Sequence, residues 1–163
     1  HFFKGDKIMK KFLIFLLAVL ALTFVACGKD KDIESYLDME RIKSEFNIEK
    51  QDKEQIKFTD KDESRSVYRI FNFQKMKNVD FKNPKKIDSL EEGYIEQGCD
   101  IIYKDKDTIM IGIFDPEVGY GYNIHNFDNS KTTLEIIVAI GSQDELSEKD
   151  LFEILKEAKS FIK

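Results

Sequence analysis

Hydrophobic and polar residues alternate with two different periods along this chain. Apolar side chains at every second position predict β-strands at 55–59, 66–73, 99–104, 107–114, 118–125 and 132–140. Apolar side chains at helical spacing predict helices at 33–46, 84–97 and 148–162. The predicted order is therefore a helix, two strands, a second helix, four strands and a last helix, with a polar linker at 48–55.

The last two helices have clear sequence signals at their boundaries. Asn83-Pro84 is a capping residue followed by a proline in the first turn, and Gly98 can end that helix in the left-handed conformation. Ser147 and Asp150 form the pattern of a capping box at the start of the last helix. One side of this helix is an apolar stripe made of Leu151, Ile154, Leu155, Ala158, Phe161 and Ile162. Because a helix cannot bury such a stripe alone, we expect it to pack on the sheet.

The strand at 107–114 is apolar on both faces. Its residues Ile109, Ile111 and Ile113 alternate with Met110 and Phe114, which predicts a central strand covered on both sides. Short connections between the strands favour antiparallel pairing. The predicted fold is therefore a single α+β domain over 33–163, with helices packed on an antiparallel β-sheet of about five to six strands. The order of its elements is similar to that of Mog1/PsbP-like sandwiches.

The N-terminal region differs from this pattern, because residues 12–25 carry no charge. A buried amphipathic helix would show more polar residues than Thr23, and a transmembrane helix needs about 20 apolar residues. A secretory signal needs a basic segment, which Met9-Lys10-Lys11 supplies, a short apolar stretch, and a small residue such as Ala26. We therefore expect a signal peptide that starts at Met9, with 1–8 as read-through of the leader and processing after residue 26.

A cysteine follows the predicted cleavage site. The sequence Phe24-Val25-Ala26-Cys27 resembles the lipobox of bacterial lipoproteins, with Phe24 where that family usually has leucine. The resemblance implies that the Cys27 thiol receives a diacylglyceryl group, that cleavage falls between Ala26 and Cys27, and that 27–32 form a lipidated tether. The segment at 146–151 also looks like the last helix of some uncharacterised lipoprotein domains of low-GC Gram-positive bacteria. A plain secretory signal with an incidental cysteine is the alternative interpretation.

The charge balance narrows the classes of partner. The chain has 26 Lys and Arg against 31 Asp and Glu, and residues 1–26 contain four of these lysines and one aspartate. The remainder therefore has 22 basic and 30 acidic residues, so we expect no nucleic-acid partner, because an acidic domain repels phosphate. The expected partners are the membrane, through the lipid anchor, and a small molecule or protein. The expected location is the extracytoplasmic side of the cell membrane.

Residues that could carry catalysis are scarce. After processing, His125 is the only histidine and Cys99 the only free thiol, and together they could act as a base and a nucleophile. However, Cys99 shares a face with Ile101 and Tyr103, which favours a buried core thiol. The position of His125 favours a solvent-exposed or lightly packed side chain. Because phosphate-binding, serine-nucleophile and zinc motifs are also missing, we expect neither enzymatic activity nor a cofactor.

Three Asp-Lys-Asp segments suggest calcium loops at first sight, at 30–32, 60–62 and 105–107. A calcium loop needs further oxygen ligands and a glycine at fixed positions, which these segments do not have, so solvated turns are the better interpretation. Asp115, Glu117, Asp128 and Asn129 flank the strand at 118–125 and could coordinate a cation jointly. No metal site is predicted with defined ligands.

The strand at 118–125 is the best candidate for a binding surface. Tyr120 and Tyr122 alternate with Gly119, Gly121 and, further along, His125. Aromatic rings beside glycines can form a shallow platform for a sugar, a peptide or a lipid, whereas core packing against the last helix is the alternative. The sequence therefore favours a lipid-anchored extracytoplasmic binding or interaction module of a bacterial cell envelope. A small envelope hydrolase that uses Cys99 and His125 is the alternative function.

Overall fold

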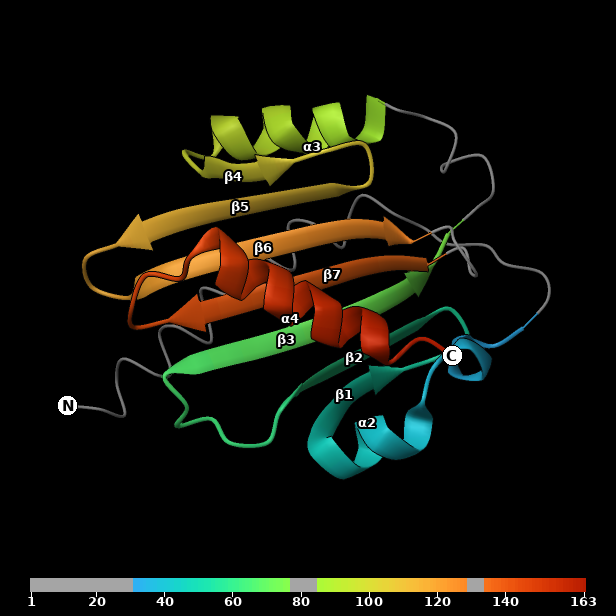
Figure 1. Cartoon of the computed structure of the whole chain (residues 1–163). Helices are drawn as coiled ribbons and strands as arrows, with labels where there is room; N and C mark the ends of the chain where they lie inside the picture. The colour runs from blue at the N-terminus through green and yellow to red at the C-terminus, as the bar shows by residue number, and fades with distance from the viewer. Residues whose placement is uncertain (1–30, 77–84, 129–133) are drawn as a thin grey trace.

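The computed structural model describes residues 31–76, 85–128 and 134–163. These ranges form one antiparallel sheet of seven strands in the order β1-β2-β3-β7-β6-β5-β4, with helices packed on both faces (Figure 1). The predicted α+β class is confirmed, but the sheet has seven strands rather than five to six. The signal peptide, Cys27, Asn83-Pro84 and Asn129 lie outside the described residues. Within them, no helix has the length and apolar character needed to cross a membrane.

The elements follow one another in an order close to the predicted one. Their bounds are η1 Ile33–Tyr36, α2 Met39–Glu45, β1 Phe46–Gln51, β2 Gln55–Asp60, β3 Val67–Lys75, α3 Lys85–Glu96, β4 Asp100–Lys104, β5 Thr108–Asp115, β6 Gly119–Asp128, β7 Leu134–Ser142 and α4 Glu148–Ser160. The strands β2 to β7 and the helices α3 and α4 lie within a few residues of their predictions.

In the N-terminal part of the domain, two predictions are wrong. The single helix expected at 33–46 is a short 3-10 helix followed by α2, and the linker expected at 48–55 begins with the end of edge strand β1. Asp38 interrupts the longer helix, because its side chain accepts a hydrogen bond from the backbone of Arg41 at 3.2 Å and caps α2. Strand β1 is polar because it is an edge strand, whose backbone pairs with β2 while most of its side chains face solvent.

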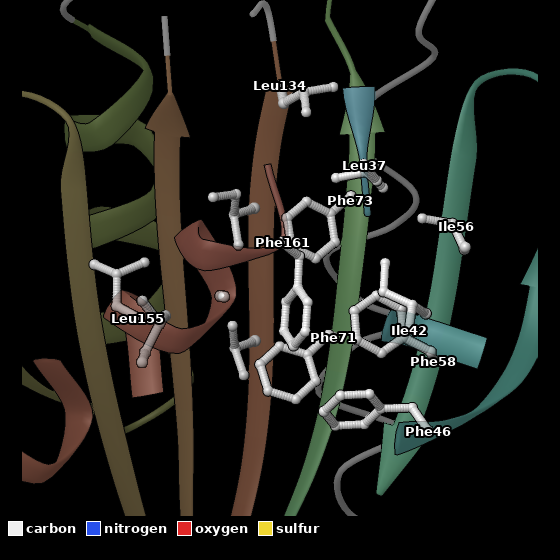
Figure 2. Close-up of a cluster of buried hydrophobic side chains, with 14 of the residues drawn as sticks. Leu37, Ile42, Phe46, Ile56, Phe58, Phe71, Phe73, Leu134, Leu155 and Phe161 are labelled. Atoms are coloured by element: carbon white, nitrogen blue, oxygen red, sulfur yellow. The ribbon is translucent and has the colours of Figure 1, made fainter. Parts of the chain in front are cut away.

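One face of the sheet, which we call the α4 face, carries an aromatic core (Figure 2). Phe161, just after α4, makes edge contacts with Phe46, Phe58 and Phe71, with ring centroids 5.4, 5.6 and 6.0 Å apart. Phe58 also stacks on Phe71 at 5.2 Å. The predicted stripe of the last helix is confirmed: Leu151, Leu155, Ala158 and Phe161 are buried, and Ile154 and Ile162 pack against the same core.

The opposite face, which we call the α3 face, is covered by α3 along the β4 and β5 side of the sheet (Figure 1). Ile87, Leu90 and Tyr94 of α3 pack with Ile109 and Ile111 of β5. Strand β5 is thus covered on both faces, as predicted, but it is second from the edge. The central strand is β7, in which all nine residues are buried. After α3, the predicted left-handed residue is confirmed, because Gly98 has φ +79°.

The strands give the sheet two distinct ends. At the η1 end, the backbone N–H of Ile33 donates to Lys53 at 2.9 Å, in the turn that joins β1 and β2. At the hairpin end, Tyr120 lies opposite Ser142, next to the turn that joins β5 and β6. The length of β6 separates these two ends by about 30 Å, since a strand rises about 3.3 Å per residue.

Candidate functional site

Strand β6 carries all five residues that the sequence predicts to bind a ligand, but its alternation divides them between two faces. Tyr120 and Tyr122 lie on the α4 face, whereas Gly119, Gly121 and His125 occupy the alternate positions. The five residues therefore cannot form one site, and each group has different neighbours.

Tyr122 belongs to the core. Its side chain is 3% exposed and packs with the aromatic cluster of the α4 face. Its hydroxyl oxygen accepts a hydrogen bond from the backbone N–H of Leu146 at 2.8 Å, which fixes the loop that leads into α4. Burial raises the pKa of this hydroxyl. Tyr122 therefore fits the alternative interpretation of the sequence, in which this residue packs in the core near the last helix.

Tyr120 is only half-buried, and its exposed neighbour is Phe114 of β5. The two residues lie directly opposite each other in the sheet, with ring centroids 4.7 Å apart. Phe114 is 58% exposed, although the sequence pattern placed it on a covered face of its strand. Phe114 lies near the end of β5, next to the β5–β6 turn, where no helix of the described ranges buries it. We call Phe114 and Tyr120 the aromatic pair, and it is the exposed part of the predicted platform.

The glycines beside Tyr120 have roles in the conformation and packing of the backbone. Gly119 has φ +106°, and a Cβ atom there would lie 2.7 Å from the carbonyl oxygen of Ser142. Another backbone therefore approaches closely at Gly119, where the β5–β6 turn lies against the end of β7. Gly121 is buried in the sheet between Ile113 and Gly141.

His125 is fully buried, so the prediction of an exposed or lightly packed side chain is wrong. Strand periodicity places His125 on one face of the sheet, but it does not reveal that Tyr94 of α3 covers this face. The Nε2 atom of His125 lies 2.7 Å from the hydroxyl of Tyr94, and Nδ1 lies 3.4 Å from a carboxylate oxygen of Glu135. The amide of Asn123 donates to the same Tyr94 hydroxyl at 3.3 Å.

Both ring nitrogens of His125 have partners. The oxygen of Tyr94 accepts from the amide of Asn123 and lies within hydrogen-bond distance of Nε2 of His125. Nδ1 of His125 faces Glu135. Burial raises the pKa of Tyr94, which keeps the phenol protonated. The arrangement holds the imidazole of His125 between a phenol and a carboxylate.

The buried polar groups extend beyond this network to β3. Gln74 lies directly opposite Glu135, and Asn72 is two residues away on the same face. In the described part of the chain, one side-chain atom of each has no hydrogen-bond partner, namely Nδ2 of Asn72, Nε2 of Gln74 and Oε2 of Glu135. We call Asn72, Gln74, Asn123, His125 and Glu135 the polar cluster, which sequence reasoning missed because its members come from three strands.

The predicted pair of Cys99 and His125 is not assembled. Asp100, next to Cys99, pairs with Gly112, which pairs with Tyr122, three residues from His125. This register separates the two backbones by two strands, about 10 Å, and by about 10 Å along the strands. Both ring nitrogens of His125 also face other groups. Cys99 is buried, and burial raises the pKa of its thiol, in agreement with a core thiol.

The described residues contain no group of three or more His, Cys, Asp or Glu side chains that could hold a metal ion. Asp115 and Asp128, which the sequence suggested could coordinate a cation jointly, lie at opposite ends of β6 and are therefore too far apart to do so. The Asp105 carboxylate accepts from the backbone of Asp107 at 2.8 Å, as expected of a turn. At 60–62 the prediction of a solvated turn is wrong for Asp60, which is buried and binds Arg69.

Comparison of the chain with known protein families, curated proteins and solved structures found no match. The likeness to Mog1/PsbP-like sandwiches and to bacterial lipoproteins therefore stays a prediction from the sequence.

Proposed function

We propose that this chain is a lipid-anchored, extracytoplasmic binding module of a bacterial cell envelope, and that the aromatic pair is part of its binding surface. The anchor is Cys27, which follows a basic segment, an apolar stretch and the lipobox-like sequence Phe24-Val25-Ala26. A diacylglyceryl group supplies two acyl chains, which is enough for stable attachment to a membrane.

The observation that carries the proposal is the separation between the aromatic pair and the point where the tether joins the domain. Ile33 lies at the η1 end of the sheet, and the aromatic pair lies at the hairpin end, about 30 Å away along the strands. Only five residues lie between Cys27 and Ile33, so this segment spans at most about 20 Å. The proposed anchor therefore holds the η1 end near the membrane and presents the hairpin end away from it.

The chemistry of the aromatic pair supports a binding role. Phe114 and Ile95 are the exposed large hydrophobic side chains of the described residues. Single exposed hydrophobic residues are ordinary, and Ile95 is of that kind. Phe114 instead contacts a partly exposed tyrosine in a tilted ring pair, and such paired rings offer a surface on which a ligand can stack.

The anchor is tested by the intact mass of the protein after extraction from membranes of a bacterial host. We expect a chain that begins at Cys27 and carries an added diacylglyceryl mass, and we expect Cys27→Ala to leave the membrane fraction. A chain that retains Met9 and an unmodified sulfur would refute the anchor.

The binding surface is tested with native mass spectrometry of the purified protein, in which a retained ligand appears as added mass. We expect Phe114→Ala and Tyr120→Ala to lose that mass with unchanged circular dichroism. Ile95→Ala is the matched control, because it removes the other exposed hydrophobic side chain, on α3. Equal loss in Ile95→Ala would place the ligand elsewhere.

A further inference from the structure

We propose that the hairpin end binds a basic peptide segment, whose lysine or arginine side chains stack on Phe114 and Tyr120 and pair with the carboxylates around them. This inference rests on the proposed function and names the chemistry of the partner.

Two acidic segments lie next to the aromatic pair. Asp115 is the last residue of β5, directly after Phe114, and Glu117 lies in the β5–β6 turn. Asp144 and Glu145 belong to the loop between β7 and α4, which follows Ser142, the residue opposite Tyr120. Gly119 lies against the backbone of Ser142, so the two segments meet at this end of the sheet. The hairpin end therefore combines the aromatic pair with carboxylates from two segments.

These carboxylates have no cationic partner in the described ranges. None of the four is in an ion pair with a lysine or arginine, and Glu117, Asp144 and Glu145 are exposed. Arg65 lies at the same end of the sheet, but its guanidinium donates to Asp60 at 3.1 Å.

The negative charge of this region also acts on Tyr122, the buried neighbour of Tyr120. Burial is the main cause of the raised pKa of Tyr122, and the charge of Glu145 raises it further. Between Lys106 and Lys149 the sequence contains one lysine and no arginine. An incoming cation therefore meets a negative potential at the aromatic pair, with no nearby positive charge from these segments.

A cation over the face of phenylalanine or tyrosine is attracted by the ring, and the attraction adds to that of neighbouring carboxylates. The carboxylates belong to two segments next to the rings, so a single ammonium group can pair with fewer of them than a peptide with several basic side chains. A peptide with several basic side chains can occupy the rings and both segments together. This distribution of charge favours a basic peptide over a single small amine.

The test uses the full chain, purified in a neutral detergent, and synthetic peptides in which glycine alternates with lysine, glutamine or glutamate. Isothermal titration calorimetry measures the affinity. We expect the lysine peptide to bind, the other two not to bind, and the affinity to fall at least tenfold between about 50 mM and about 500 mM salt. Lysine amide alone should bind at least tenfold more weakly than the peptide. Equal binding of the glutamine peptide, or of lysine amide, would overturn the inference.

Matched variants separate a defined site from general attraction to an acidic protein. Phe114→Ala and the double variant Glu117→Gln, Glu145→Gln should each weaken binding of the lysine peptide about three- to tenfold. Ile95→Ala and Glu40→Gln remove an exposed hydrophobic group and an exposed charge from helices, and both should bind normally. Equal losses in the control variants would overturn the inference. If another ligand needs Phe114 while the lysine peptide does not bind, the charge inference fails and the binding module stands.

Discussion

The two faces of this sheet bury their side chains in different ways. The α4 face is a dry aromatic core, in which rings of β1, β2 and β3 meet Phe161 (Figure 2). The α3 face combines the apolar residues under α3 with the polar cluster, which has several atoms without hydrogen-bond partners in the described ranges. Burial of apolar surface stabilises the fold, whereas an unpaired buried polar atom costs free energy. We therefore expect the α4 face to dominate stability.

The largest effect is expected for Phe71→Ala on the α4 face. Phe71 is fully buried and its ring contacts Phe46, Phe58 and Phe161, so truncation removes apolar area and leaves a cavity. We expect the free energy of unfolding, measured in urea, to fall by about 3–5 kcal/mol. A loss below about 1 kcal/mol would show that the aromatic core does not carry the stability of the domain.

The next largest effect is expected where a buried ion pair borders this core. Arg69 binds Asp60 at 2.8 Å and also contacts Glu157 of α4. Burial lowers the pKa of Arg69, but the hydrogen bond and charge of Asp60 outweigh it and raise the pKa. Asp60→Ala would leave a buried cation with one fewer partner, at a cost of about 3 kcal/mol.

The measurement for Asp60→Ala is urea denaturation at neutral pH, with Asp62→Ala as the control. Asp62 is exposed, and its side chain accepts only from the backbone and hydroxyl of Ser64. We expect Asp62→Ala to change the free energy of unfolding by less than about 0.5 kcal/mol. Equal effects of the two variants would argue against a stabilising role for the buried pair.

On the α3 face, Tyr94→Phe is expected to cost about 1–2 kcal/mol at neutral pH. The variant keeps the ring but removes the hydroxyl that faces Nε2 of His125 at 2.7 Å, which leaves a buried ring nitrogen unpaired. The measurement is urea denaturation of both proteins at pH 7. A loss as large as that of Phe71→Ala would contradict the ranking of the two faces.

The raised pKa of Tyr94 adds a pH dependence to this comparison. The unfolded chain ionises at the ordinary tyrosine value of 10.0, whereas the folded chain keeps the proton to higher pH. The contribution is therefore complete below pH 10 and is lost as the pH rises above it, at up to about 1.4 kcal/mol per pH unit. The gap between wild type and Tyr94→Phe should narrow above pH 10, and a constant gap would contradict the assignment.

The sequence predicts the α4 face well because the pattern there is local. The stripe of α4 and the alternation in β3 and β7 each follow from one segment, so their buried residues could be predicted. The polar cluster could not, since Gln74, His125 and Glu135 become neighbours only through the order of the strands. The aromatic pair was half predicted: Tyr120 was identified, whereas Phe114 resembled an ordinary covered position of an apolar strand.

A smaller effect, of opposite sign, is expected for Glu135→Gln. The carboxylate is fully buried, and its Oε2 atom has no partner in the described ranges. A glutamine oxygen can still accept from Nδ1 of His125, while the cost of burying a charge is removed. We expect the free energy of unfolding in urea to rise by about 1 kcal/mol at pH 7. A decrease of 2 kcal/mol or more, on the order expected for breaking a buried ion pair, would instead show that the Glu135 carboxylate stabilises the fold.

The smallest effect on stability is expected for Phe114→Ala at the hairpin end. Phe114 is 58% exposed and contacts Tyr120 through one tilted ring pair, so truncation should change the free energy of unfolding by less than about 1 kcal/mol. Urea denaturation of Phe114→Ala beside Phe71→Ala provides the comparison, because both variants truncate a phenylalanine in a strand. If both unfold far more easily, Phe114 is part of the core and the aromatic pair is no binding surface. A near-native value would show that this ring is not part of the core, as the proposed binding surface requires.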